Sequence, residues 1–300
     1  MCNTTFTARN QKRYILTLAE INTMLIVGLT GSIATGKSTV SRLLSLEPYN
    51  LPVIDADLLA RKVVEPGTSG YRQILARFSS TTPGLVADEA TGALDRAVLG
   101  RRVFGNSPES VRDRKELNKI IHPLVRGEIY RGIVRAYLSG AWAVMLDVPL
   151  LFESGLEVMC GGVVVVAAGE EAQLRRLLKR DPGLSEEDAH RRIGSQWSVA
   201  EKAQLAEHVF GAPARRASAW VIDNSGDFEN LEREVRRVVV GGMVRGRVGA
   251  WRWLWGFPPL ALVVGLWVMA ENWWRRRAWE AKEGTAVEAG TDAANGKAKL

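Results

Sequence analysis

Five short apolar runs alternate with longer, more polar segments along the chain. The runs are rich in Val, Ile and Leu and lie at 24–30, 51–57, 141–150, 161–169 and 218–224. Nearly continuous apolar runs, rather than a strict apolar-polar alternation, are typical of strands buried on both faces of a parallel sheet. The segments between them are long enough for crossover helices. The sequence therefore predicts an α/β fold with a five-stranded parallel sheet and flanking helices.

Two of the connecting segments have features beyond a simple crossover. The connection from Asp57 to Ala141 is much longer than a crossover needs and carries apolar residues at helical spacing, which predicts a small helical subdomain at about 85–140. The segment 173–198 carries six arginine or lysine residues around the turn Asp181-Pro182-Gly183. This composition indicates a mobile, arginine-bearing helical lid. With both parts included, the predicted core domain covers 24–242.

A glycine-containing motif follows the first predicted strand. Residues 31–38 match the pattern G-x-x-x-x-G-K-[ST] and precede a predicted helix at 39–46. Backbone N–H groups and the helix N-terminus bind phosphate oxygens in this motif, while Lys37 is expected to contact the β- and γ-phosphates and Ser38 to help hold Mg²⁺. The expected nucleotide-binding residues are Gly31, Ser32, Ile33, Ala34, Thr35, Gly36, Lys37, Ser38 and Thr39.

The motif alone does not separate kinases from GTPases and motor ATPases. The sequence has no Asn-Lys-x-Asp run for guanine recognition, because Asn118-Lys119 is followed by two isoleucines. The chain is also shorter than a typical motor. These two observations favour a kinase that uses ATP.

Charged residues near the predicted strand ends are candidates for catalysis. Asp55 and Asp57 end the second run, and at i and i+2 on a strand both would face the phosphates, one of them as a general base. Asp147 ends the third run, at a usual position for a carboxylate that orients Mg²⁺. The alternative for each aspartate is a helix N-cap. Arg176 and Arg180 share one helix face and suit a transferring phosphoryl group, the alternative being a solvated charged face.

Several stretches, in this order, resemble dephospho-CoA kinase. They are IVGLTGSIATGKSTVS (26–41), VIDADLLARKVVEPG (53–67), LDRAVLGRRVF (94–104), IIHPLVR (120–126), VPLLFESGL (148–156), QLRRLLKRD (173–181), RRIGSQWS (191–198) and VIDNSGD (221–227). The resemblance covers roughly 24–240, and the DAD-x-x-AR and PLLFE segments are its most specific parts. Two departures are Ser32 and Ala34, which replace common glycines and would be strained at positive φ, and a longer stretch at 207–218.

The resemblance implies a P-loop NTPase fold with a helical CoA-binding subdomain and a lid. The implied reaction is ATP-dependent phosphorylation of the ribose 3′-hydroxyl of dephospho-CoA, giving coenzyme A and ADP in the last step of coenzyme A biosynthesis. By this resemblance Asp57 is the base, Lys37 and Arg176 stabilise the transferring group, Arg180 supports the lid and Asn224 lies near the adenine. The implied substrate-binding residues are Asp55, Arg61, His122, Leu151, Glu153 and Gln196.

Two alternatives to this function stay open. One is a different small-molecule P-loop kinase, such as a nucleoside kinase. The other is a membrane-tethered protein that binds nucleotide without turnover. His122 also has an alternative, since a single histidine is more often a structural residue than a ligand.

The C-terminal charge pattern points to a membrane and not to nucleic acid. The net charge is +7, and the stretch from Arg245 to Arg277 holds six arginines and one glutamate around an apolar segment. Eighteen residues from Trp253 to Ala270 carry no charge; as a helix they would span about 27 Å. Flanking tryptophans and arginines are typical membrane anchors. The sequence therefore predicts a membrane segment at 251–270.

Pro258-Pro259 would kink a spanning helix, so a segment that lies in the interface or packs on the protein stays open. A single span would leave the kinase domain facing the cytosol, at the mitochondrial outer membrane or the endoplasmic reticulum; the alternative is a cytoplasmic protein. Residues 1–23 are expected to form a disordered leader, and 271–300 a polar tail. The two cysteines, Cys2 and Cys160, suggest neither a disulfide framework nor a zinc site.

Overall fold

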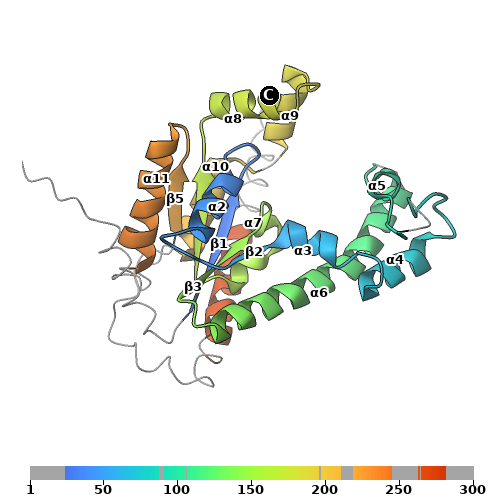
Figure 1. Ribbon diagram of the computed structural model, residues 1–300, viewed down its shortest axis with the longest axis horizontal. Coiled ribbons are helices and arrows are strands. Elements are labelled where there is room, and N and C mark those ends of the chain that lie inside the picture. The colour runs from blue at the N-terminus through green and yellow to red at the C-terminus, as the bar shows by residue number, and fades with distance from the viewer. Residues whose placement is uncertain are drawn as a thin grey trace, which may run out of the picture. The chain divides into compact units, whose positions relative to one another are not determined.

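The computed structural model describes residues 24–87, 91–105, 107–195, 197–210, 219–244, 263 and 265–281 (Figure 1). The chain divides into two compact units. Residues 54–136 form the helical unit, and residues 1–53 together with 137–300 form the sheet unit. The predicted leader at 1–23 lies outside the described residues.

A five-stranded sheet with the order β2-β3-β1-β4-β5 organises the sheet unit (Figure 1). The strands are β1 (Leu25–Gly31), β2 (Val53–Asp55), β3 (Ala143–Asp147), β4 (Gly162–Ala167) and β5 (Ala219–Asp223). β1 pairs in parallel with β3 on one side and with β4 on the other. The five predicted parallel strands are confirmed. The order also places β1 at the centre of the sheet, so its carboxyl end, where the glycine motif begins, lies between the ends of two neighbours.

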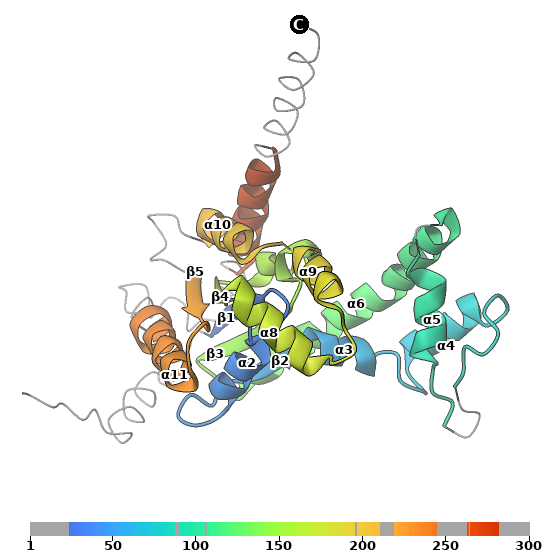
Figure 2. The same ribbon diagram turned by 90° about the horizontal axis from the view of Figure 1, so that it is seen from above.

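Helices cover both faces of this sheet. On one face, α2 (Lys37–Ser45) and α11 (Phe228–Arg236) share a buried core with the strands. On the other face, α10 (Val199–Phe210) packs against β4 and β5. Figure 2 shows α10 on the opposite side of the sheet from α2 and α11. Because both faces are covered, the central strands consist almost wholly of buried apolar residues, as their sequence predicts.

The remaining helices of the sheet unit follow β3, β4 and β5. They are α7 (Leu151–Ser154), the 3₁₀ helix η1 (Leu156–Met159), α8 (Glu170–Arg180), α9 (Glu186–Gly194) and the π helix η2 (Arg237–Val244). α8 and α9 lie in the segment expected to be a lid. They contact each other, and Nη1 of Arg192 lies 3.3 Å from Oδ2 of Asp181 in the turn between them.

The helical unit is built on α3 (Ala56–Lys62), α4 (Ser69–Phe78), α5 (Arg96–Val103) and α6 (Pro108–Leu138). Ile74, Phe78, Leu99, Val103 and Leu117 share its buried core. Helix caps fix where these helices start, because the side chains of the residues before α3, α4 and α5 accept backbone N–H groups. This unit spans 54–136, and α4 shares its buried core with α5 and α6; a substrate subdomain at about 85–140 stays a prediction.

The C-terminal part of the described chain is a helix. Residue 263 and residues 265–281 are helical, while most of the expected membrane segment, 251–270, lies outside the described residues. Over the described residues, no helix combines the length and the apolar character needed to cross a membrane. Of the expected polar tail at 271–300, the structure describes residues 271–281, which continue the helix and include the fully buried Asn272. The rest of the tail lies outside the described residues.

Candidate active site

The phosphate loop is the turn between β1 and α2, at residues 31–38. Gly36 precedes α2 with φ 87° and ψ 22°, a left-handed conformation that glycine adopts without strain. A Cβ atom here would clash with Nδ2 of Asn224, so a side chain at this position would displace that amide. No side chain caps α2. The N-terminus of this helix therefore offers its N–H groups to an anion.

Ser32 and Ala34, the two departures from glycine, differ in backbone conformation. Ala34 has φ 59°, in the left-handed region that costs an L-residue roughly 1–2 kcal/mol. Ser32 has no positive φ. Its hydroxyl instead donates a hydrogen bond to the backbone oxygen of Trp197, at 2.9 Å. The expected strain is thus present at Ala34 and absent at Ser32.

Lys37 and Asp147 form an ion pair at the carboxyl edge of the sheet. Asp147 is the last residue of β3, pairs in register with Leu29 of β1, and is only 4% exposed. A carboxylate this deeply buried is costly unless a cation compensates it, and Lys37 is that cation. The pair holds the lysine head group where it adjoins the phosphate loop.

The residues around this pair suit a magnesium ion held largely by phosphate. Ser38 follows Lys37 in the first turn of α2 and is exposed. Hydroxyl and carboxylate oxygens are the ligand types that Mg²⁺ takes in nucleotide sites, with phosphate oxygens and water completing the shell. Within the described ranges, no three His, Cys, Asp or Glu residues form a cluster that could hold a metal by themselves. Ser38 and Asp147 therefore fit an ion that arrives with the nucleotide.

Arg176 of α8 lies against the phosphate loop. Its Nη2 donates to the backbone oxygen of Asn224 at 2.7 Å, and Nδ2 of Asn224 donates to the backbone oxygen of Thr35 at 2.8 Å. Nη1 of Arg176 is buried and has no hydrogen-bond partner among the described residues. That nitrogen lies 3.8 Å from the Cβ position of Gly36. A buried, unpaired, charged donor beside a phosphate loop is a binding group for an anion.

Asn224 was expected near the adenine, and the structure places its side-chain amide on the loop itself. Its hydrogen bond to Thr35 and its 7% exposure show that it holds the loop in shape. Arg180 ends the same helix as Arg176, is exposed, and lies 3.3 Å from the carboxylate of Asp181. Both arginines lie on α8, as the sequence predicts. Of the two, Arg176 reaches the phosphate loop and Arg180 does not.

A buried lysine fixes the segment after β3. The backbone oxygen of Pro149 accepts hydrogen bonds from Oγ1 of Thr30, at 2.9 Å, and from Nζ of Lys202, at 3.2 Å. Lys202 is fully buried, and its Nζ lies 3.5 Å from Oε1 of Glu153. Burial lowers the pKa of Lys202; Glu153 opposes this, and the like charge of Lys37 adds to it. Glu153 is therefore oriented by a cation on α10.

Leu151 and Gln196 were expected to bind substrate. Leu151 is fully buried, and Gly28 of β1 leaves the space that its Cδ2 fills. Its side chain belongs to the core under β1, and a substrate contact at this residue stays a prediction. Gln196 lies outside the described residues.

The acceptor-side candidates Asp55, Asp57, Arg61 and His122 belong to the helical unit. β2 ends at Asp55, whose carboxylate accepts the N–H of Leu58 at 2.9 Å and so caps α3. The expectation that the strand reaches Asp57 is wrong, because Asp57 lies in the first turn of α3, where its side chain is exposed. Arg61 on α3 and His122 on α6 are exposed as well.

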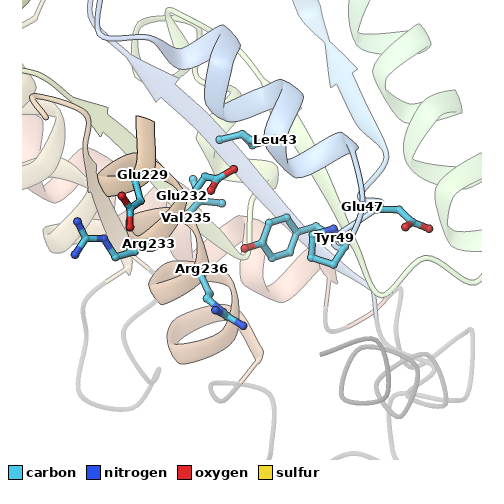
Figure 3. A pocket seen from close by; sticks show the side chains of 9 residues that line it. Leu43, Glu47, Tyr49, Glu229, Glu232, Arg233, Val235 and Arg236 are labelled. Carbon is cyan, nitrogen blue, oxygen red and sulfur yellow. The ribbon is translucent and has the colours of Figure 1, made fainter. Parts of the chain in front are cut away.

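A separate pocket of about 360 Å³ lies at the far end of α2 from the phosphate loop (Figure 3). Tyr49 faces α11 there, beside Glu232 and Arg236. It contains none of the residues described above and is not part of the site.

Comparison with known proteins identifies the family. A family model described as dephospho-CoA kinase matches residues 25–228. The chain belongs to the dephospho-CoA kinase family. It is 46% identical over 215 residues to dephospho-CoA kinase CAB5 of Saccharomyces cerevisiae, covering 72% of this chain and 83% of that one. It is 44% identical to dephospho-CoA kinase of Geobacillus kaustophilus, covering 72% and 95%. A crystal structure of TT1252 from Thermus thermophilus matches with a TM-score of 0.55 and 34% identity, over 73% of this chain and 97% of that one.

Two residues at this site, Lys202 and Trp197, were not predicted from the sequence. Lys202 stands among polar residues and reads as a solvated helix residue. The sequence feature that could have revealed its burial is its helical spacing to Leu205, Ala206 and Val209, which together with Lys202 form the buried face of α10. Trp197 acts on the loop through its backbone oxygen, a contact for which side-chain patterns give no signal.

Proposed function

We propose that this kinase transfers the γ-phosphoryl group of ATP to the ribose 3′-hydroxyl of dephospho-CoA, giving coenzyme A and ADP. The observation that carries the proposal is the pair of cations at the phosphate loop, Lys37 beside Asp147 and Arg176 with its unpaired buried N–H. Phosphoryl transfer spreads negative charge over the moving group, so groups that stabilise it must already be in place. Family membership supplies the acceptor and the place of the reaction as the last step of coenzyme A biosynthesis.

On the nucleotide side, the backbone of the loop and the N-terminus of α2 would bind the β-phosphate, with Lys37 at the β- and γ-phosphates. Ser38 and Asp147 would hold Mg²⁺ or its water. Bound Mg²⁺ bridges phosphate oxygens and neutralises part of their charge. Nη1 of Arg176 would donate to an oxygen of the transferring group, and Arg180 would act from the exposed end of α8.

On the acceptor side, we infer that Asp57 takes the proton from the 3′-hydroxyl. Its exposed carboxylate lies in the first turn of α3, and a carboxylate within hydrogen-bond reach of a hydroxyl can take its proton. Asp55 would support Asp57 by capping α3. Glu153, oriented by Lys202, together with Arg61 and His122, would position the substrate.

The test is turnover by the purified protein with ATP, Mg²⁺ and dephospho-CoA, compared with a panel of nucleosides. Asp57→Asn should lower kcat by about 10²–10⁴-fold and leave ATP binding nearly unchanged. Asp95→Asn is the matched control, because Asp95 caps α5 outside the proposed site and asparagine also caps helices well. Unchanged turnover in Asp57→Asn would remove Asp57 from the role of base. Turnover of nucleosides alone would replace the acceptor, and ATP binding without turnover of any acceptor would refute the kinase activity.

We further propose that the C-terminal segment attaches the kinase domain, facing the cytosol, to a membrane surface. In the helix at 265–281 and at residue 263, five large apolar side chains are exposed: Val263, Leu266, Trp267, Trp273 and Trp274. Arg277 lies over the ring of Trp273, with 4.7 Å from its Cζ to the ring centroid. Tryptophan and arginine on one helix are typical of an interfacial anchor.

Flotation of the full-length protein with anionic vesicles tests the attachment. The protein should float with the vesicles, and Trp267→Ser combined with Trp274→Ser should reduce that fraction while turnover in solution is kept. Equal flotation of the two proteins would refute attachment through this surface.

A further inference from the structure

The inner face of the C-terminal helix is fixed to the sheet unit by buried polar contacts. Asn272 is fully buried, and its Nδ2 donates to the backbone oxygens of Val158, at 3.2 Å, and Cys160, at 3.0 Å. Arg276 is ion-paired with Glu157, a carboxylate with no exposed surface. Figure 2 shows the helix at 265–281, in dark red, on the same side of the sheet as α10. Buried polar groups with matched partners fix the register and the rotation of a helix more sharply than apolar packing does.

This register brings Trp279 to Trp197. The two ring centroids are 5.8 Å apart and the ring planes are tilted by 45°, within the range of favourable aromatic pairs. Trp197 lies in the short connection between α9 and α10. It is the point at which the lid segment joins the helix that carries the buried Lys202.

The backbone of Trp197 is in turn held by the phosphate loop. Its carbonyl oxygen accepts the hydroxyl of Ser32 at 2.9 Å, and Ser32 is 7% exposed. A glycine at position 32 has no hydroxyl and could not make this bond. Ala34, two residues after Ser32, is held at positive φ, so a contact that fixes this stretch of backbone opposes its relaxation. A continuous series of contacts therefore runs from Trp279 through Trp197 to Ser32.

We propose that Trp279 is a positioning residue for nucleotide binding, acting through Trp197 on the backbone of the phosphate loop. The helix at 265–281 braces the connection between α9 and α10, and that connection holds Ser32 in the conformation in which the loop N–H groups meet phosphate. The inference rests on the proposed binding of ATP at this loop. It adds that the affinity for ATP depends on a helix that lies beyond the family match, which ends at residue 228.

The test measures the ATP dissociation constant of the full-length protein in solution, without membranes. Trp279→Ala should weaken ATP binding by about two- to tenfold, the range expected from the loss of one aromatic pair. Trp279→Phe should restore most of the affinity, because it keeps a ring at the contact. Trp274→Ala is the matched control: its ring is 68% exposed on the same helix, and its removal should leave ATP binding unchanged.

A double-mutant cycle separates this role from a general loss of stability. Ser32→Ala removes the other end of the series without altering the helix. If the contacts act in series, Ser32→Ala with Trp279→Ala should weaken ATP binding no more than the stronger single variant does. Unchanged affinity in Trp279→Ala, or effects that multiply in the double variant, would overturn the proposal. Failure of the unaltered protein to bind ATP would refute the proposed function instead, so the two outcomes are distinguishable.

Discussion

Replacing Arg176 with methionine should separate catalysis from stability in this kinase. The substitution keeps a long, flexible side chain and removes the guanidinium. In the structure, Nη2 makes one hydrogen bond, to the oxygen of Asn224, while Nη1 is buried without a partner among the described residues. Losing the hydrogen bond costs about 1 kcal/mol, whereas removing a buried, unpaired donor returns about 1–3 kcal/mol. We therefore expect Arg176→Met to be as stable as the unaltered protein, or more stable by up to about 2 kcal/mol.

The effect on turnover should have the opposite sign. If Nη1 donates to the transferring phosphoryl group, its removal should lower kcat by about 10²–10³-fold, as for other single donors that stabilise a transition state. Arg176→Lys should give an intermediate loss, because an ammonium group keeps the charge but not the planar pair of donors. Arg175→Met is the control, since Arg175 is the exposed neighbour on the same helix.

Steady-state kinetics with ATP and dephospho-CoA, together with unfolding in urea, measure both quantities. A kcat of Arg176→Met within tenfold of the unaltered protein would refute the catalytic role of Arg176. A loss of more than about 2 kcal/mol of stability would refute it as well, because Arg176 would then stabilise the fold instead of serving as an open anion-binding group.

Two further predictions concern stability. Ala34→Gly removes the cost of positive φ, roughly 1–2 kcal/mol, but adds about 0.4–1 kcal/mol of unfolded-state entropy. The variant should therefore gain up to about 1.6 kcal/mol of stability; a lower melting temperature would contradict this. Burial raises the pKa of Glu157, and Arg276 limits that rise. Arg276→Ala should raise this pKa further. A carboxyl whose pKa is higher in the folded than in the unfolded protein destabilises the fold increasingly as pH rises from the unfolded-state pKa to the folded-state pKa. Urea unfolding should show that the variant loses about 3 kcal/mol of unfolding free energy at pH 8 and less at pH 5. An equal loss at the two pH values would be evidence against a charged, buried Glu157.

The apolar runs predicted the strands well because a parallel sheet covered on both faces needs uninterrupted burial. β3 and β4 carry that pattern over most of their length. The second run predicted a strand to Asp57, yet the strand ends at Asp55 because the carboxylate of Asp55 caps the following helix. A local hydrogen bond from the backbone to a side chain competes with extension of the strand, and the pattern of apolar residues gives no sign of it.

The candidate site was predictable where the residue type itself carries the chemistry. Lys37 and Arg176 follow from the motif and from charge on a helix. Lys202 did not, because a buried lysine is exceptional and only the three-dimensional packing of α10 shows it. For the C-terminal segment, packing on the protein was one of the alternatives left open. The contacts that fix the helix could not be predicted, since Asn272 looks polar and solvated in sequence until Val158 and Cys160 supply its partners.

The strand order sets when the sheet can form during synthesis. β1 pairs with β3 and β4 but not with β2, the next strand in sequence. β1 therefore has no partner strand until residues from 143 onward have left the ribosome. At ordinary rates of translation this delay is on the order of 10 s. The helical unit, whose contacts lie within 54–136, is completed during that delay and shortens the loop that β1 must close. We expect hydrogen exchange during refolding to protect the helical unit before β1; simultaneous protection of both would show that the chain folds as one cooperative body.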